Sequence, residues 1–419
     1  MPYARSGGEL HVDGVPLARI ADAVGTPAYV YSWPSVRDRY AELDTALDGT
    51  GQRICYSVKA NGNLALLARL AKLGAGFDIV SGGELERVLR AGGDPSRVVF
   101  SGVGKSVEDI DFGIKCGIDA FNVESASELD RIESRARVIG RKARVSIRVN
   151  PDVDAHTHPY IATGLKENKF GVPADLAVEL YRRAAASADL YVVGIACHIG
   201  SQIAQVEPFR EALCGLLGLV DALGKFGIAV EHLDIGGGFG IVYEDETPLD
   251  LDALGQVLRA TLGRRPAKLY VEPGRLLVAE AGILLTRVEY LKPAPAPGYR
   301  NFAVVDAAMN DLIRPALYGA WHAVDAVAPG GAPSKHWDVV GPVCETGDFL
   351  ALDRELAVAE GDLLAIREAG AYGFSQGSNY NTRPRPPEVI VDEDGFTVAR
   401  KRETVADLLR LEITTPERP

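Results

Sequence analysis

The alternation of two kinds of segment between about residues 50 and 290 is the feature that most constrains the fold of this chain. Short runs rich in β-branched residues alternate with longer stretches in which apolar residues recur at helical spacing. Strands that alternate with helices form parallel sheets, and eight such repeats in one stretch predict a closed (β/α)8 barrel of the TIM type. The predicted strands are Arg53–Val58, Phe77–Val80, Val98–Phe100, Ala120–Val123, Val145–Val149, Tyr191–Cys197, His232–Ile235 and Lys268–Val271. The predicted helices include Leu64–Leu73, Gly83–Ala91, Ala126–Arg135, Ala174–Ala186 and Phe209–Leu223.

The chain after the barrel follows a different pattern. Predicted strands are separated by glycine- and proline-rich turns with few helical intervals, which indicates a mainly-β domain. Two short N-terminal strands, Leu10–Val12 and Ala28–Tyr31, are expected to join it. The predicted organisation is N-terminal strands in residues 1–40, the barrel in residues 41–290 and a C-terminal β domain in residues 291–419. The strands predicted in this last domain are Tyr299–Asp306, Asp338–Cys344, Leu363–Glu368 and Glu388–Val391.

The composition is that of a globular enzyme, with 47% apolar and 24% charged residues. The formal net charge of -12 argues against nucleic acid or a membrane surface as partner, because both attract basic patches. No apolar stretch reaches the roughly 20 residues that a membrane helix needs. The segment Met1–Leu17 lacks the pattern of a signal peptide. We therefore expect a cytoplasmic protein.

The cysteines and histidines favour neither a disulfide framework nor a metal site. Five cysteines are widely spaced without a C-x-x-C pair, which suits a reducing compartment. His156 and His158 lie close to Asp152 and Asp154, a combination that could bind a metal. No further histidine or cysteine follows at ligand spacing, so we interpret this segment as a loop and expect no metal.

Polar residues follow the predicted strands in a regular way. Barrel enzymes gather their active sites at the C-terminal ends of the strands, where the loops after all eight strands meet. Each predicted strand has a candidate functional residue within it or just after it. These candidates are Lys59, Asp78, Ser101, Glu124, Arg148, His198, Gly236–Gly238 and Glu272.

Lys59 stands at the end of the first predicted barrel strand. A lysine held in an apolar pocket has a lowered pKa, and its neutral amine can form a Schiff base with a carbonyl substrate or with pyridoxal phosphate. The alternative is a lysine whose ammonium extends to solvent at the end of the strand.

Two motifs after the last strands are compatible with a phosphorylated cofactor. The glycines in Asp234–Gly240 allow backbone N–H groups to converge on an anion, and the loops after strands 7 and 8 often form the phosphate site of a barrel. A Rossmann fingerprint is the rival interpretation, but the spacing is not G-x-G-x-x-G. Glu272 could keep a pyridine nitrogen protonated, or it could form a salt bridge with Arg275.

Two further candidates are a histidine and a cysteine. His198 follows the sixth strand and could stack on a cofactor ring, with Ser201 donating to a phosphate. Cys344 precedes Glu345 in the β domain. An isolated cysteine usually packs in a core, but the neighbouring carboxylate makes a proton donor plausible.

Together these motifs resemble the fold-type III, alanine-racemase-like decarboxylases that use pyridoxal phosphate, and within them the diaminopimelate decarboxylases. The resemblance covers almost the whole chain, and its most particular segments are 157–171 and Arg314–Tyr318. The other motifs that carry it are Tyr56–Asn61, Phe77–Glu84, Arg148–Pro151, His198–Gln202, Glu272–Arg275, Met309–Ile313, Cys344–Glu345 and Ala371–Phe374.

The resemblance implies a role for each matching residue. Lys59 would form the Schiff base, His198 would stack on the ring, and Glu272 would pair with the ring nitrogen. Cys344 would be the proton donor, delivered from the partner subunit of a homodimer with shared active sites. The residues expected to bind the cofactor are Lys59, Asp78, Arg148, His198, Ser201, Gly236, Gly237, Gly238, Glu272, Gly274, Arg275 and Tyr372. Those expected to bind the substrate are Arg275, Arg314, Tyr318, Glu345 and Tyr372.

The implied reaction is the decarboxylation of meso-2,6-diaminopimelate to L-lysine and CO2, the last step of lysine biosynthesis. The distal end of this substrate keeps a carboxylate and an ammonium. Arg275 and Arg314 offer planar donors for a carboxylate, and Glu345 offers an anion for the ammonium. The chain departs from the family pattern at Ala196, Thr346 and Ser375–Gly377, which leaves the fine substrate preference open.

Three alternatives are weighed against this expectation. One is another amino-acid decarboxylase of the same fold that acts on an altered substrate in a secondary pathway. A second is a regulatory protein that binds pyridoxal phosphate, but such proteins resemble the barrel alone. The third, an alanine racemase, is disfavoured because that family places an arginine at the pyridine nitrogen, where this chain has Glu272.

Overall fold

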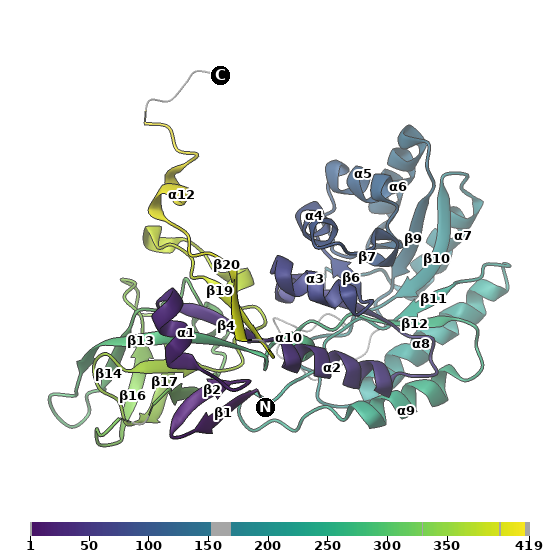
Figure 1. The fold of residues 1–419 in the computed structure, drawn as a ribbon. Coiled ribbons are helices and arrows are strands. Elements are labelled where there is room, and N and C mark those ends of the chain that lie inside the picture. Colours follow the sequence, from purple (N-terminus) through teal and green to yellow (C-terminus); the bar gives the residue numbers. More distant parts are fainter. Residues whose placement is uncertain (1, 152–168, 329, 394, 415–419) are drawn as a thin grey trace. The chain divides into compact units, whose positions relative to one another are not determined.

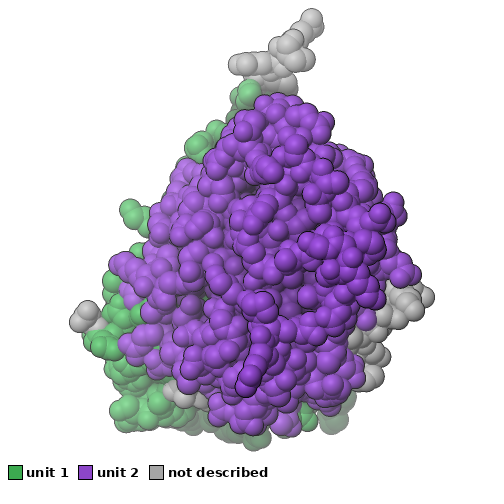
Figure 2. Space-filling view, turned by 90° about the vertical axis from the view of Figure 1, so that its right-hand side faces the viewer, with its two compact units in different colours: residues 1–36, 243–245, 278–419 green, residues 37–242, 246–277 purple. Residues whose placement is uncertain are grey.

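The computed structural model describes residues 2–151, 169–328, 330–393 and 395–414. They form two compact units, one of residues 1–36, 243–245 and 278–419 and the other of residues 37–242 and 246–277, coloured green and purple in Figure 2. We call them the β unit and the barrel unit. No helix in the described ranges is long and apolar enough to cross a membrane. The segment with His156 and His158, and most of the motif at 157–171, lies outside the described residues.

The barrel unit contains the predicted closed barrel of eight parallel strands (Figure 1). The strands follow each other around the barrel in sequence order, and β12 closes it by pairing with β5. All eight predicted strands are confirmed, within about two residues at each end. They are β5 (Arg53–Ser57), β6 (Gly76–Ile79), β7 (Val98–Phe100), β8 (Ala120–Val123), β9 (Ala143–Arg148), β10 (Leu190–Ala196), β11 (His232–Asp234) and β12 (Lys268–Val271).

The helices of this unit begin and end where local chemistry predicts. The side chains of Ser81, Ser106 and Ser125 accept the N–H of the third residue of α4, α5 and α6, which satisfies one of the free donors there. Gly117 and Gly140 end α5 and α6 in the left-handed conformation that a helix C-terminus often needs. The helices are α2 (Trp33–Ala46), α3 (Leu64–Lys72), α4 (Gly82–Arg90), α5 (Val107–Cys116), α6 (Ala126–Ile139), α7 (Ala174–Ala186), α8 (Glu207–Gly224) and α9 (Leu251–Leu262).

The β unit is built on a large sheet in which β17, β16, β14, β13, β4, β19 and β20 are neighbours in that order. The N-terminal strand β4 pairs with both β13 and β19, as the expected contribution of the N-terminus requires. A three-stranded sheet, β1 (Tyr3–Ser6), β2 (Glu9–Val12) and β3 (Val15–Pro16), precedes it. The strands of the large sheet are β4 (Ala28–Ser32), β13 (Gly282–Lys292), β14 (Phe302–Val305), β15 (Val324–Ala326), β16 (Lys335–Val340), β17 (Phe349–Leu356), β18 (Leu363–Ile366), β19 (Glu388–Asp392) and β20 (Gly395–Arg400). The short helices of this unit are α1 (Leu17–Val24), α11 (Arg314–Tyr318) and α12 (Val405–Leu409), whereas residues 275–277 of the short helix α10 (Arg275–Val278) belong to the barrel unit.

The two units end at different residues from those expected. The expected boundary after residue 290 falls inside β13, and the one after residue 40 falls inside α2. The β13 strand belongs to the β unit because it pairs with β4, β14 and β18. The strand expected at Asp338–Cys344 ends at Val340, so Cys344 lies in the following loop.

Candidate active site

Lys59 lies in a single helical turn (Val58–Ala60) directly after β5. Its Nζ is 2.6 Å from Oδ2 of Asp78, which is fully buried in the neighbouring strand β6. The hydroxyl of Ser57 donates to the same oxygen at 2.9 Å. The pocket, which was expected to be apolar, therefore contains a carboxylate that holds the lysine amine at the end of the barrel.

Glu272 follows β12, and its side chain is buried in the same end of the barrel. Its Oε1 accepts hydrogen bonds from Ser101 Oγ at 3.3 Å and from Asn122 Nδ2 at 3.4 Å. Burial raises the pKa of Glu272 well above its usual value, and the nearby Asp234 and Asp78 carboxyls raise it further. A buried carboxyl in this setting favours a cationic partner, which a protonated pyridine nitrogen would provide.

The glycine-rich turn after β11 depends on backbone that a side chain would obstruct. A Cβ on Gly237 would lie 2.0 Å from the carbonyl oxygen of Glu272, and one on Gly238 would lie 2.1 Å from that of Gly200. Gly236 and Gly238 also have φ angles of 73° and 90°, which glycine adopts without strain. The sequence therefore folds three loops of the barrel into close contact at the expected phosphate site.

His198 is held against this turn. The backbone N–H of Gly237 donates to Nδ1 of His198 at 3.1 Å, so Nδ1 is an acceptor. Burial lowers the pKa of His198 well below its usual value, and the positive charges of Arg148 and Lys59 lower it further. The imidazole is thus neutral and fixed in orientation, as a ring that stacks on a cofactor must be.

The remaining cofactor candidates of the barrel are also anchored there. Arg148 forms an ion pair with Glu124 at 3.0 Å. Glu124 also accepts the backbone N–H groups of Gly102 at 3.1 Å and Gly171 at 2.9 Å. Arg275 donates from Nη2 to Ser201 Oγ at 3.3 Å.

Gly274 precedes α10, and its carbonyl accepts the N–H of Leu277 at 3.2 Å. The backbone therefore turns into the short helix directly after Glu272. Lys59, Asp78, Glu272, His198 and the glycines consequently belong to one connected set of contacts at the C-terminal ends of the strands.

Sequence reasoning did not single out two members of this set. Asn122 lies within the buried strand β8 and donates to Ser101 Oγ at 3.1 Å as well as to Glu272. Asp234 is the last residue of β11 and accepts the N–H of Gly236 at 2.8 Å. The available signal was a polar residue inside a strand that is otherwise buried.

The β unit carries Cys344 and Glu345 in the loop after β16, where both are exposed. Asp348 anchors this loop, because its carboxylate accepts the N–H groups of Val343 at 2.7 Å and Met309 at 2.6 Å. The hydroxyl of Tyr380 donates to Oε1 of Glu345 at 2.5 Å. Cys344 is therefore an exposed thiol on an anchored loop, not a core cysteine.

Arg314 begins α11 and is 7% exposed. Its guanidinium lies 5.3 Å from the ring centre of Tyr243 and 5.9 Å from that of Tyr318, at distances where cation–π attraction operates. Tyr372 has a φ angle of 56°, which is uncommon for a tyrosine and indicates a constrained loop.

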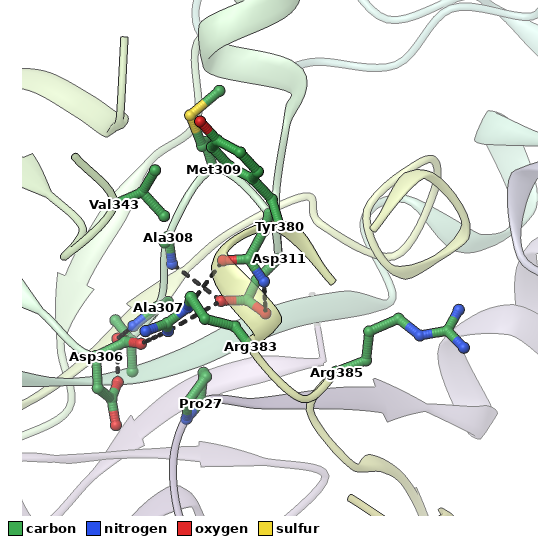
Figure 3. A network of polar contacts seen from close by, with 12 residues as sticks. Pro27, Asp306, Ala307, Ala308, Met309, Asp311, Val343, Tyr380, Arg383 and Arg385 are labelled. Atoms are coloured by element: carbon green, nitrogen blue, oxygen red, sulfur yellow. Dashed lines mark hydrogen bonds and ion pairs between the residues drawn. The ribbon is translucent and has the colours of Figure 1, made fainter. Parts of the chain in front are cut away.

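The loop before Arg314 is fixed by the network drawn in Figure 3. Arg383 donates to the carbonyl of Asp306 at 2.5 Å and to Oδ1 of Asn310 at 2.9 Å, and it lies 3.7 Å from the carboxylate of Asp311. Asp311 in turn accepts the N–H of Ala308 at 3.0 Å. The loop that precedes the candidate substrate-binding residue Arg314 is thus held by side-chain contacts rather than by sheet pairing.

Comparison with known proteins identifies the family of the chain. The family described as "Pyridoxal-dependent decarboxylase, pyridoxal binding domain" matches residues 34–279. The diaminopimelate decarboxylase of Pseudomonas aeruginosa is 56% identical over 409 residues, which are 98% of each chain.

Two solved structures have the same fold over nearly their whole length. The diaminopimelate decarboxylase of Helicobacter pylori, complexed with L-lysine, has a TM-score of 0.91 at 44% identity and covers 94% of this chain and 99% of its own. That of M. jannaschii, also with L-lysine, has a TM-score of 0.93 at 38% identity and covers 99% and 98%.

The fold and the site together define a decarboxylase that depends on pyridoxal phosphate. Its relatives are more specific than that class. With 56% identity over nearly the full length of both chains, this chain belongs to the diaminopimelate decarboxylase family.

Proposed function

We propose that this protein decarboxylates meso-2,6-diaminopimelate to L-lysine and CO2, the last step of lysine biosynthesis. The observation that carries the proposal is the 56% identity, over 98% of both chains, with a diaminopimelate decarboxylase. Two solved relatives complexed with L-lysine, the expected product, give independent support.

The residues of the barrel fit pyridoxal phosphate. Lys59 is the lysine that would carry it, and Glu272 would face its ring nitrogen. Ser201, Gly236–Gly238, Gly274 and Arg275 would hold its phosphate, together with Tyr372 of the β unit. The turn is closely packed at Gly237, where a Cβ would lie 2.0 Å from the Glu272 carbonyl, so only glycine lets the backbone follow this path beside the phosphate. When bound, this cofactor supplies an electron sink for the electrons left by the departing carboxylate.

The chain's own residues orient the side chains that would contact the cofactor. Asp78 fixes the Lys59 amine at 2.6 Å, so that the amine points in one direction. His198 offers a neutral ring face held by the Gly237 N–H. Arg148 adds a positive charge on the same side of the barrel, and its own orientation is set by Glu124.

The distal carboxylate and ammonium of the substrate are the groups that distinguish it from other amino acids. We assign Arg314, with Arg275, Tyr318 and Tyr372, to bind the distal part of the substrate, because a planar guanidinium matches a carboxylate with two parallel hydrogen bonds. Glu345 provides the anion for the distal ammonium. Its Oε1 accepts the Tyr380 hydroxyl, which leaves Oε2 for the substrate.

Cys344 is assigned as the acid that delivers a proton from Sγ to the carbon that has lost its carboxylate. Lys59 belongs to the barrel unit and Cys344 to the β unit. We propose that the two residues of one site come from different subunits of a homodimer. The compartment that suits this chain is the cytoplasm, since all five cysteines are free thiols.

The experiment that tests this function is a substrate panel. CO2 release is measured from meso-diaminopimelate, lysine, ornithine, arginine and carboxynorspermidine with the protein loaded with pyridoxal phosphate. We expect turnover of meso-diaminopimelate to exceed that of every other compound by at least roughly 100-fold in kcat/KM, because only this substrate satisfies both an arginine and a glutamate at its distal end. Preferential turnover of another amino acid would establish the altered-substrate decarboxylase instead.

A further inference from the structure

Tyr380 of the β unit contacts a residue that is assigned to the substrate. Its hydroxyl donates to Oε1 of Glu345 at 2.5 Å, although Tyr380 is 46% exposed and Glu345 is exposed as well. A hydrogen bond between two exposed side chains adds little to stability, because in the unfolded chain water replaces each partner. The consequence of this bond is therefore the direction that it gives to the Glu345 carboxylate.

The backbone directly after Tyr380 is strained. Tyr380 begins the short turn Tyr380–Thr382, in which Asn381 and Thr382 both have a φ angle of 56°. This left-handed conformation is uncommon for residues other than glycine, and it is least favourable for a β-branched residue such as threonine. Residues of this kind persist only where the surrounding contacts determine the backbone, and they gather at functional sites.

Side chains hold the turn from both ends. Asn379 donates from Nδ2 to the carbonyl of Arg383 at 3.0 Å and to Oε2 of Glu403 at 2.8 Å. The carbonyl of the buried Asn310 accepts the N–H of Ser378 at 2.9 Å. Arg383, drawn with Tyr380 in Figure 3, donates from Nε to Oδ1 of the same asparagine at 2.9 Å. The turn is thus fastened to the loop that precedes α11.

The backbone of Glu345 is fixed separately. Its N–H donates to the carbonyl of Val343 at 2.8 Å, and its own carbonyl accepts the N–H of Asp348 at 3.0 Å. A glutamate side chain on such a backbone still has several rotatable bonds, whose freedom is lost when the carboxylate binds a ligand. The bond from Tyr380 restricts this freedom before a ligand arrives, which favours binding.

We propose that Tyr380 is a positioning residue, which holds the Glu345 carboxylate in the orientation that binds the distal ammonium of the substrate. The proposal rests on the proposed function, since it uses the role assigned to Glu345. Tyr380 acts only through Glu345. The hydrogen bond to Glu345 raises the pKa of Tyr380 above its usual value, so the hydroxyl keeps the proton that it donates throughout the neutral range.

Two ligands that differ by one ammonium test the proposal without turnover. L-lysine carries the distal carboxylate and ammonium of the substrate unchanged, as its α-carboxylate and α-ammonium, whereas 6-aminohexanoate has the same chain without the α-ammonium. Calorimetry measures the Kd of each with the full chain loaded with pyridoxal phosphate. Tyr380→Phe should raise the Kd of L-lysine by about 5- to 10-fold, because the Glu345 carboxylate is no longer oriented. The Kd of 6-aminohexanoate should stay within about twofold, because this ligand has no ammonium for Glu345.

The matched control is Tyr299→Phe, which removes the hydroxyl of a tyrosine of the same unit that is 68% exposed. It should leave both Kd values within about twofold. A second comparison asks whether Tyr380 acts through Glu345. In the background of Glu345→Gln, which itself should weaken L-lysine, adding Tyr380→Phe should change the Kd of L-lysine by less than about twofold, since coupled residues are not additive. Circular dichroism confirms that each variant is folded.

The outcomes separate this inference from the proposed function. If Glu345→Gln weakens L-lysine and Tyr380→Phe does not, Glu345 keeps its role and the positioning role of Tyr380 is overturned. If Tyr380→Phe weakens both ligands equally, its effect is on the structure of the loop, and the proposal is also wrong. If neither variant weakens L-lysine, or if the wild type does not bind it, the assignment of Glu345 in the proposed function fails and this inference fails with it.

Discussion

At the scale of single residues, the carboxylates of the barrel site differ in whether they have a cationic partner. Asp78 is paired with Lys59 and Glu124 with Arg148, whereas Glu272 receives hydrogen bonds from the neutral side chains of Ser101 and Asn122. Burying such a carboxyl costs stability unless it is protonated or meets a cation. The site is thus arranged to accept a positively charged group at Glu272.

The first prediction at this scale concerns the lysine that carries the cofactor. Reduction of the loaded protein with borohydride should leave a pyridoxyl group on Lys59, located by mass spectrometry of peptides, because this amine is held at the end of the barrel. Lys105 is the internal control. Its Nζ is buried and bonded to Glu128 at 2.6 Å and to two carbonyls at 2.8 Å, so it should remain unmodified. A label on Lys105 would contradict the assignment.

The second prediction concerns Glu272 in the loaded enzyme. Glu272→Gln removes the charge that would keep the ring nitrogen protonated while preserving the shape of the side chain. We expect kcat to fall by about 100-fold or more, which corresponds to roughly 3 kcal/mol of barrier. Steady-state kinetics with cofactor occupancy measured in parallel checks this. Turnover close to wild type at full occupancy would assign the carboxyl a structural role only.

At the scale of elements, the barrel could be predicted because each of its strands is a short apolar run with a helix on either side. These strands are buried on both faces, so their sequences read as continuous hydrophobic segments. The positions of Lys59, Asp78 and Glu272 within or just after their strands predict that the three side chains lie at the same end of the barrel. Asn122 and Asp234 were missed because only the folded barrel brings them next to Glu272.

The β unit was harder to predict for a physical reason. Its central strand β13 pairs with β4, about 250 residues earlier in the chain, and such pairings leave no local sequence pattern. The β20 strand is only partly buried and contains polar residues, so its alternation is weak. The five-residue helix α11 is too short for helical periodicity, so its position was supported only by the family motif at Arg314–Tyr318.

The third prediction belongs to α11. Arg314→Ala removes the guanidinium from the first residue of the helix without touching the cofactor residues of the barrel. We expect KM for meso-diaminopimelate to rise by roughly 30- to 1,000-fold, since a buried carboxylate loses a charged partner worth about 2–4 kcal/mol. Absorbance and binding of pyridoxal phosphate should be unchanged.

The control for this variant is Arg300→Ala in the same unit. Arg300 has a side chain that is 67% exposed, and it forms an ion pair at 2.8 Å with Asp338, whose side chain is 6% exposed. Its loss should leave KM within about twofold, because Arg300 has no proposed role in binding the substrate. If Arg314→Ala bound the substrate as tightly as wild type, another residue would have to bind the distal carboxylate.

At the scale of the whole molecule, the proposed chemistry draws on residues of both units. The residues proposed to bind the cofactor, Lys59, Glu272 and His198, belong to the barrel unit, and those proposed to act on the substrate, Cys344, Glu345 and Arg314, belong to the β unit. An enzyme that divides its site in this way needs both kinds of unit for every turnover. In a symmetric dimer the second kind can come from the partner chain.

The last prediction tests whether the β unit of each active site comes from the partner chain. Lys59→Ala and Cys344→Ala should each be nearly inactive as homodimers. When the two variants exchange subunits, half of the dimers are mixed, and each mixed dimer has one site with both residues intact. The mixture should therefore recover up to about a quarter of wild-type activity. Mixing Lys59→Ala with Glu272→Gln is the matched control, because both changes lie in the barrel unit and no site in their mixed dimer is intact. Recovery in the first mixture alone would show that Cys344 acts in the site of the partner. Subunit exchange is verified by mass spectrometry of differently tagged subunits. If exchange occurs without recovery of activity, Cys344 acts in the site of its own chain or has no catalytic role.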